Sequence, residues 1–122
     1  MQTDKNLIKI DSVVFGDWII KHYAPMSHLK VQKLLFYSDS YHLAYFDKEL
    51  ISDKFEAWVH GPVSRRVYNS LKNQSVIYAE MSYSQREDGV DVDNELDKLT
   101  SGQKVLIKGV LDELNQWTAF EL

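Results

Sequence analysis

The sequence predicts a mainly helical α+β fold, a single domain spanning residues 1–122 with one long central helix and a small antiparallel sheet or hairpin. Three observations lead to this prediction. A helical pattern without proline or glycine runs through residues 29–46. A short strand-like run follows at 55–60 and meets a Gly-Pro pair. A second clear helical pattern begins just after residue 100.

The first helix is predicted to begin at Asp11 or Ser12, whose side-chain oxygens can accept hydrogen bonds from first-turn amides. Pro25 should end it, because the residue before a proline is disfavoured in the α region. Ser27 is a suitable cap for the long helix. The expected apolar face of the first helix is Val14, Phe15, Trp18, Ile19 and His22. The expected stripe of the long helix is Val31, Leu34, Leu35, Ser38, Tyr41, His42 and Tyr45.

Residues 55–60 carry the large and β-branched side chains typical of a strand. Gly61 and Pro62 are expected to end that strand, because proline lacks the amide hydrogen of a sheet ladder. Proline is also favoured at the first position of a helix. Pro62 is therefore predicted to open a helix that buries Val63, Val67 and Leu71.

The region after residue 75 predicts a hairpin. Ile77, Ala79, Met81 and Tyr83 alternate with polar residues, as in a half-buried strand. Asp88-Gly89 is a hairpin-turn signal, and Val90 and Val92 would form the return strand. The last helix should begin with a capping box made by Thr100 and Gln103. Its expected core stripe is Leu106, Ile107, Val110, Leu111, Leu114 and Trp117.

Composition limits the class of protein. The chain is 44% hydrophobic and 26% charged, as in an ordinary globular domain. It has no cysteine, which excludes disulfides and thiolate chemistry and suits a reducing cytoplasm. No apolar run reaches the ~18 residues of a membrane helix, and the start lacks a signal-peptide pattern. A cytoplasmic protein without a membrane partner is therefore expected.

Charge is distributed unevenly. The formal net charge is −4. Residues 86–122 hold four basic and nine acidic side chains, whereas residues 54–72 hold four basic side chains against one glutamate. So few basic groups predict no nucleic-acid partner.

Chemical motifs are scarce. Four histidines (His22, His28, His42 and His60) show no metal-ligand spacing, and His42 and His60 are interpreted as hydrogen-bonded residues of the core or its rim. The acidic run at 91–97 lacks the glycine and the final glutamate of a calcium loop. No nucleophile elbow or phosphate-binding glycine loop is present. We expect a non-enzymatic protein without metal or cofactor.

Aromatic and basic residues suggest a protein-binding surface, since arginine and aromatic side chains dominate interface hot spots. Arg65, Arg66 and Lys30 are each expected in the first turn of a helix, where positive charge is slightly unfavourable. For the arginine pair this misfit indicates a partner's carboxylate or phosphate, or else a solvated pair. The proposed contact face is Lys30, Lys33, Tyr37, Trp58, Arg65, Arg66 and Tyr68.

Two blocks of this chain resemble the signature of the Panacea (SocA-like antitoxin) domain family, which combines an LKLQKLLYY-type helix with a later EAW-(Y/H)GPV segment and a downstream tyrosine. The matching residues are Leu29, Lys30, Gln32, Lys33, Leu34, Leu35, Tyr37, Glu56, Ala57, Trp58, Gly61, Pro62, Val63 and Tyr68. The resemblance covers about residues 10–120 and is strong over 28–70. Family members usually continue into a further helix and a Thr-His…Pro-Trp segment, which this sequence lacks.

The resemblance implies an antitoxin of a toxin–antitoxin system, which neutralises a cognate toxin by direct protein contact and is often carried by phages and mobile elements. A proteolytic adaptor acting with an ATP-dependent protease, or a phage-encoded inhibitor of a host enzyme, is the alternative, and it would use the same surfaces. A third hypothesis is a hydrolase using His42, Glu56 and His60, which requires these side chains to converge in a pocket.

Overall fold

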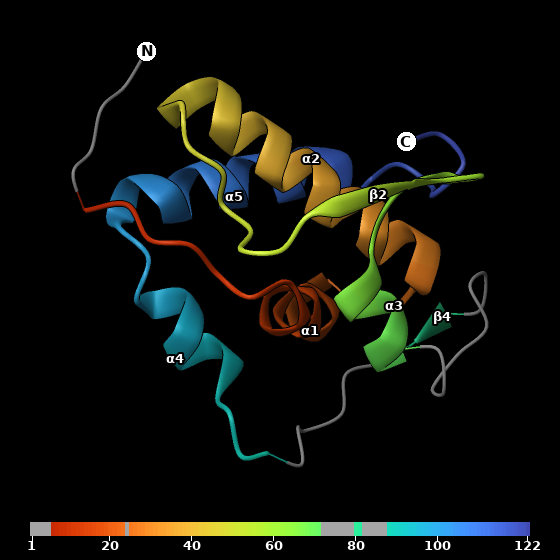
Figure 1. Ribbon diagram of the computed structural model, residues 1–122, viewed down its shortest axis with the longest axis horizontal. Coiled ribbons are helices and arrows are strands. Elements are labelled where there is room, and N and C mark those ends of the chain that lie inside the picture. Colours follow the sequence, from red (N-terminus) through yellow and green to blue (C-terminus); the bar gives the residue numbers. More distant parts are fainter. Residues whose placement is uncertain (1–5, 24, 72–79, 82–87) are drawn as a thin grey trace.

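The computed structural model describes residues 6–23, 25–71, 80–81 and 88–122. Within these ranges the chain forms helices α1 to α5 and two separate two-stranded antiparallel sheets. The predicted mainly helical α+β fold is confirmed. Helix α2 (His28–Phe46) lies across the upper part of the molecule in Figure 1, with α1 (Ser12–Tyr23) below it and α5 (Ser101–Leu114) packed against it.

The long central helix α2 spans His28–Phe46. Ser27 caps it as predicted, since its hydroxyl oxygen accepts a hydrogen bond from the backbone N–H of Lys30. Tyr41 and Tyr45 were expected in the apolar stripe, but they are 51% and 47% exposed. The buried face of α2 is therefore narrower than the sequence pattern predicts. A tyrosine at the edge of an apolar stripe can remain at the surface because its hydroxyl hydrogen-bonds to water. The buried part of the predicted stripe is Val31, Leu34, Leu35, Ser38 and His42.

Helix α1 spans Ser12–Tyr23 and packs against α2. Its cap is Asp11, whose carboxylate accepts from the N–H groups of Val13 and Val14. Phe15 and Ile19 are fully buried as expected. His22 was expected in the apolar face but is exposed, and its Nε2 lies 2.7 Å from a carboxylate oxygen of Asp93 on α4 (Val92–Asp97).

Strands β2 (Phe55–Trp58) and β3 (Gly61–Ser64) form an antiparallel hairpin, which we call the signature hairpin. Pro62 was predicted to open a helix, but it lies in β3 opposite Ala57. Gly61 has φ +122°, a conformation that favours glycine, and the chain reverses there instead of entering a helix. Proline is tolerated because each strand of this sheet has a single neighbour.

Helix α3 begins after β3 and spans Arg65–Leu71. The three residues predicted to be buried in this region, Val63, Val67 and Leu71, are at most 3% exposed. Val63 reaches the core from β3 and the other two reach it from α3.

The hairpin predicted around Asp88-Gly89 is wrong in its second half. Strand β4 (Glu80–Met81) pairs with β1 (Met26–Ser27), and Val92 opens helix α4 (Val92–Asp97) instead of a return strand. Asp91 caps α4 by accepting from two amides of the first turn, a local interaction that competes with strand formation. The expected strand residues Ile77, Ala79 and Tyr83 lie outside the described residues.

Helix α5 spans Ser101–Leu114 and begins with the predicted capping box: Thr100 accepts from the N–H of Gln103, and the Gln103 side chain accepts from the N–H of Thr100. Trp117 was expected in its core stripe, but α5 ends at Leu114, which leaves the indole 42% exposed. None of the described helices combines the length and the apolar character needed to cross a bilayer.

Candidate protein-binding surface

The signature hairpin is held to α2 by one buried glutamine. The Gln32 side chain accepts a hydrogen bond from the backbone N–H of Ser64 at 2.9 Å and donates to the backbone carbonyl of Ser64 at 3.1 Å. Its amide nitrogen also lies 3.1 Å from Nε2 of His28. Gln32, Ser64 and His28 are each at most 1% exposed, and burial lowers the pKa of His28. A side chain from the first signature block therefore fixes the end of the second.

Ser64 fixes the start of α3 as well. Its hydroxyl donates to a carboxylate oxygen of Asp53 at 2.6 Å and accepts from the N–H of Val67. It also lies 3.1 Å from the hydroxyl of Ser12 on α1. These buried contacts join three parts of the chain, so the residues on either side of Ser64 are presented on a rigid base.

Three of the seven predicted contact residues, Trp58, Arg65 and Tyr68, come together on this base. The guanidinium of Arg65 lies over the Trp58 ring, 5.2 Å from its centroid. The rings of Trp58 and Tyr68 have centroids 4.8 Å apart. The Tyr68 ring also lies near the ring of His28, with centroids 5.7 Å apart. Arg65, Trp58, Tyr68 and the buried His28 thus form a continuous row of contacts, in which the neighbouring rings are tilted rather than parallel.

Glu56 completes the group, and sequence reasoning did not include it among the contact residues. Its two carboxylate oxygens each accept a hydrogen bond from Arg65 at 2.9 Å, and one of them also accepts from the Trp58 indole. The hydrogen bonds from Arg65 lower the pKa of Glu56 most, followed by the one from Trp58. The spacing of the residues could have predicted this role, because residues two apart on a strand share a face, which places Glu56 beside Trp58. We call Glu56, Trp58, Arg65 and Tyr68 the hairpin cluster.

The unfavourable positive charge of Arg65 and Arg66 in the first turn of α3 is offset by ion pairs within the chain. Arg65 is paired with Glu56, and Arg66 donates to Asp11 at 2.6 Å. Each arginine in the first turn of α3 therefore has a carboxylate of its own chain as a partner, and the positive charge alone does not require an external anion.

The other predicted contact residues lie in different surroundings. Lys33 lies beside the hairpin turn, its Nζ 3.8 Å from where a Cβ on Gly61 would stand. Lys30 donates to the backbone carbonyl of Asn115 at 2.6 Å, and burial lowers its pKa. Tyr37 donates to the backbone carbonyl of Leu122 at 2.6 Å. Lys30 and Tyr37 thus hold the segment after α5 against α2 and are separate from the hairpin cluster.

The three residues of the hydrolase hypothesis do not form one site. His42 is fully buried, with Nδ1 2.6 Å from the carbonyl of Lys48 and Nε2 3.0 Å from the side-chain nitrogen of Gln103. Glu56 belongs to the hairpin cluster, and His60 is exposed in the hairpin turn rather than at a packed rim. Over the described ranges, no group of three or more His, Asp or Glu side chains is arranged to hold a metal ion.

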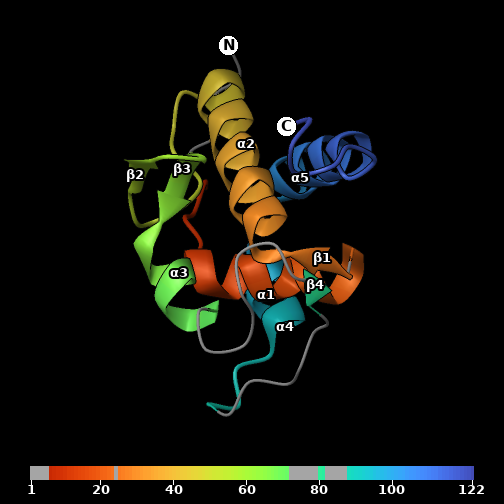
Figure 2. The same ribbon diagram turned by 90° about the vertical axis from the view of Figure 1, so that its right-hand side faces the viewer.

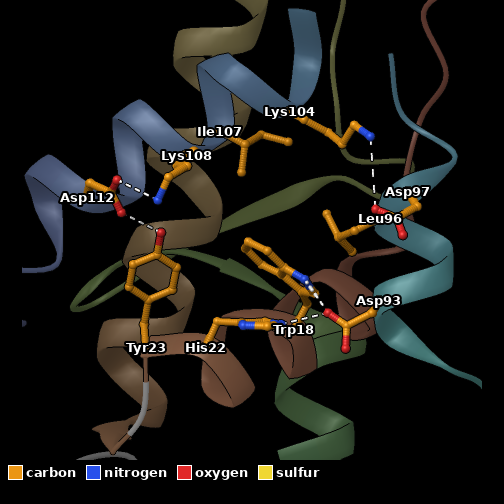
Figure 3. A pocket seen from close by; sticks show the side chains of 10 residues that line it. All are labelled: Trp18, His22, Tyr23, Asp93, Leu96, Asp97, Lys104, Ile107, Lys108 and Asp112. Atoms are coloured by element: carbon orange, nitrogen blue, oxygen red, sulfur yellow. Dashed lines mark hydrogen bonds and ion pairs between the residues drawn. The ribbon is translucent and has the colours of Figure 1, made fainter. Parts of the chain in front are cut away.

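A second surface feature is a pocket of about 520 Å³ between α1, α4 and α5, which we call the three-helix pocket. Figure 3 shows Trp18, His22 and Tyr23 entering from α1, and Leu96 and Asp97 from α4, with the α5 side chains above them. The remaining lining residues are Asp93, Lys104, Ile107, Lys108 and Asp112.

The rim of the pocket is charged. Asp93 accepts from the Trp18 indole at 3.1 Å, lies 2.7 Å from Nε2 of His22 and pairs with Lys21, and the Lys21 contact lowers its pKa most. Asp112 accepts from the Tyr23 hydroxyl at 2.7 Å, the main cause of its own lowered pKa. Burial, followed by this hydrogen bond, raises the pKa of Tyr23. Both carboxylates therefore remain ionised at neutral pH.

The fold and the hairpin cluster together define a small helical domain that presents arginine and aromatic side chains, the residue types enriched in interface hot spots, on a rigid base. The family model for the antitoxin SocA-like Panacea domain matches residues 31–122. The chain belongs to this family, which confirms the resemblance found in the two signature blocks. No curated protein and no solved structure matches the chain.

Proposed function

We propose that this protein is an antitoxin that neutralises a cognate toxin in the cytoplasm by binding it directly through the hairpin cluster. The observation that carries the proposal is the Arg65 side chain, 57% exposed yet held on the Trp58 ring by a two-pronged hydrogen bond to Glu56. Membership of the SocA-like antitoxin family supports the antitoxin role.

Side chains that are oriented before binding lower the entropic cost of forming an interface. A free arginine or tryptophan loses side-chain freedom when it is buried in an interface, at about 0.5–1.5 kcal/mol per side chain. In the hairpin cluster both side chains are already oriented before a partner arrives. Tryptophan and arginine are also the residues whose truncation most often costs 2 kcal/mol or more of binding, which is about a 30-fold loss of affinity.

Co-expression with the product of the neighbouring gene tests the proposal. The wild-type chain should restore growth, and Trp58→Ala and Arg65→Ala should each weaken both rescue and binding of the purified toxin. Trp117→Ala is the matched control, since this indole is 42% exposed and lies beyond the end of α5, away from the half-buried Trp58. A harmless neighbour, or rescue that survives loss of both Trp58 and Arg65, would exclude this mechanism.

Toxin half-life separates direct masking from delivery to an ATP-dependent protease. Masking leaves the half-life of the toxin unchanged when this protein is deleted. A proteolytic adaptor instead shortens it, and the shortening disappears in cells that lack the protease.

A further inference from the structure

The three-helix pocket is separate from the signature hairpin. Figure 2 shows the hairpin and α5 on opposite sides of α2. Among the residues that the structure describes, those lining the pocket belong to α1, α4 and α5. We propose that this pocket is a second protein-binding site, which takes apolar side chains from a lysine- or arginine-rich segment of another protein.

The floor of the pocket is apolar. Leu96 and Ile107 are buried core residues, and the half-buried Trp18 presents its ring to the cavity between them (Figure 3). A volume of about 520 Å³ lies within the ~300–1,000 Å³ of pockets that hold ligands. This is room for more than one side chain, such as two apolar residues one helical turn apart.

The charge around the pocket selects the kind of segment. The described stretch 88–122, which supplies α4 and α5, holds eight acidic side chains and three lysines, a net charge of −5. Asp97 stands on the rim with a side chain 73% exposed and its nearest lysine, Lys104, 4.0 Å away. This carboxylate can accept a hydrogen bond from a partner's cation with little loss of an existing contact.

The lysines of the rim do not reverse this preference. Lys104 and Lys108 both belong to α5, and Lys108 is held by Asp112 at 3.0 Å. On the α4 side, Asp93 already pairs with Lys21 and His22. The ion pair of Asp97 within the described residues is, by contrast, the long 4.0 Å contact with Lys104. Lysine heads on long flexible stems can swing into water while their aliphatic parts still cover the apolar floor. A basic segment would therefore lie with a cation toward Asp97 and its apolar residues over Trp18.

Tryptophan side chains provide the assay. The chain has three, and they report on different surfaces: Trp18 on the pocket, Trp58 on the hairpin cluster and Trp117 on the segment after α5. Their indole N–H signals can be followed in ¹H–¹⁵N spectra of the labelled full chain, each assigned by a Trp→Phe variant. The probes are two peptides, acetyl-Lys-Leu-Lys-Lys-Leu-Lys-amide and acetyl-Glu-Leu-Glu-Glu-Leu-Glu-amide.

The basic peptide should shift the Trp18 signal in a saturable way and leave Trp58 and Trp117 in place. At low salt it should bind at least about tenfold more tightly than the acidic peptide, and the difference should shrink as salt is added. A Trp18 signal that responds to neither peptide, or equally to both, overturns the proposal.

Two charge reversals localise the effect. Asp97→Lys removes the rim carboxylate, and lysine is tolerated there because Asp97 is the last residue of α4. Glu113→Lys changes the net charge by the same amount on an exposed position of α5 that does not line the pocket. Asp97→Lys should weaken the basic peptide about tenfold and Glu113→Lys less than about threefold. Equal effects would show that only overall charge matters and would refute a built site.

These measurements use the chain without a toxin, so they stand apart from the proposed antitoxin function. Loss of toxin binding in the hairpin variants with an intact Trp18 response supports both proposals. An absent Trp18 response with intact neutralisation removes the second site alone.

Discussion

Replacing Gln32 by alanine should remove the hydrogen bonds that join the two signature blocks and so destabilise the fold. The substitution leaves the buried N–H and C=O of Ser64 without their partner. Each buried backbone group left unsatisfied costs about 1–3 kcal/mol, so Gln32→Ala should lower the free energy of unfolding by about 2–6 kcal/mol. Against a total stability of about 5–15 kcal/mol for a domain, this is a large fraction. At roughly 4 °C per kcal/mol for this chain length, Tm should fall by about 8–24 °C.

Urea unfolding followed by circular dichroism measures this loss, and amide hydrogen exchange at Ser64 locates it. Gln32→Met retains most of the side-chain volume but none of the hydrogen bonds, and it should remain at least about 2 kcal/mol less stable than the wild type. Gln116→Ala is the matched control, because this exposed glutamine donates a single hydrogen bond to the carbonyl of Glu113, and it should change stability by less than about 0.5 kcal/mol. If Gln32→Met is as stable as the wild type and protection at Ser64 is unchanged, the reasoning is wrong.

Three further outcomes are expected. Thr100→Ala removes the cap of α5 and should cost about 1 kcal/mol in urea unfolding, whereas Thr100→Ser should retain most of it. Because burial lowers the pKa of His28, the unfolded chain binds the proton more readily; stability should fall as pH drops below about 6.5, by at most about 1.4 kcal/mol per pH unit. This dependence should be smaller in His28→Asn, and unfolding midpoints at pH 7.5 and 5.5 test it. Arg65→Lys retains the charge but loses the two-pronged hydrogen bond to Glu56. Affinity for the toxin, measured by calorimetry, should fall about tenfold, while Tm stays within about 2 °C of the wild type. Unchanged affinity would argue against a preorganised hot spot.

Local patterns in the sequence predicted the helices well. The central helix was expected over 29–46 and spans His28–Phe46, and both Ser27 and the Thr100 capping box act as predicted. Caps and helical periodicity involve residues within four positions of one another, so a sequence window contains all the information they need.

Where secondary structure depends on contacts with other parts of the chain, the sequence pattern predicted it incorrectly. Pro62 looked like the start of a helix, and Val92 looked like part of a strand. Pro62 is a strand residue because β2 lies beside it. Val92 is a buried helix residue because α4 packs against α1, while Met81 pairs with Met26 of β1 instead of with a return strand. Trp117 has an apolar side chain that the core does not reach. In each case the competing contact, and not the residue's own propensity, selected the outcome.

The candidate site shows the same division. The sequence by itself identified the family, which the family model confirms. It also placed Trp58, Arg65 and Tyr68 among the contact residues, because tryptophan, tyrosine and arginine are enriched at interface hot spots. Only the tertiary structure decided that Glu56 orients Arg65, that Gln32 secures Ser64 across 32 positions, and that three helices enclose a pocket. Such contacts join segments far apart in the chain, and their geometry exists only once the core has packed.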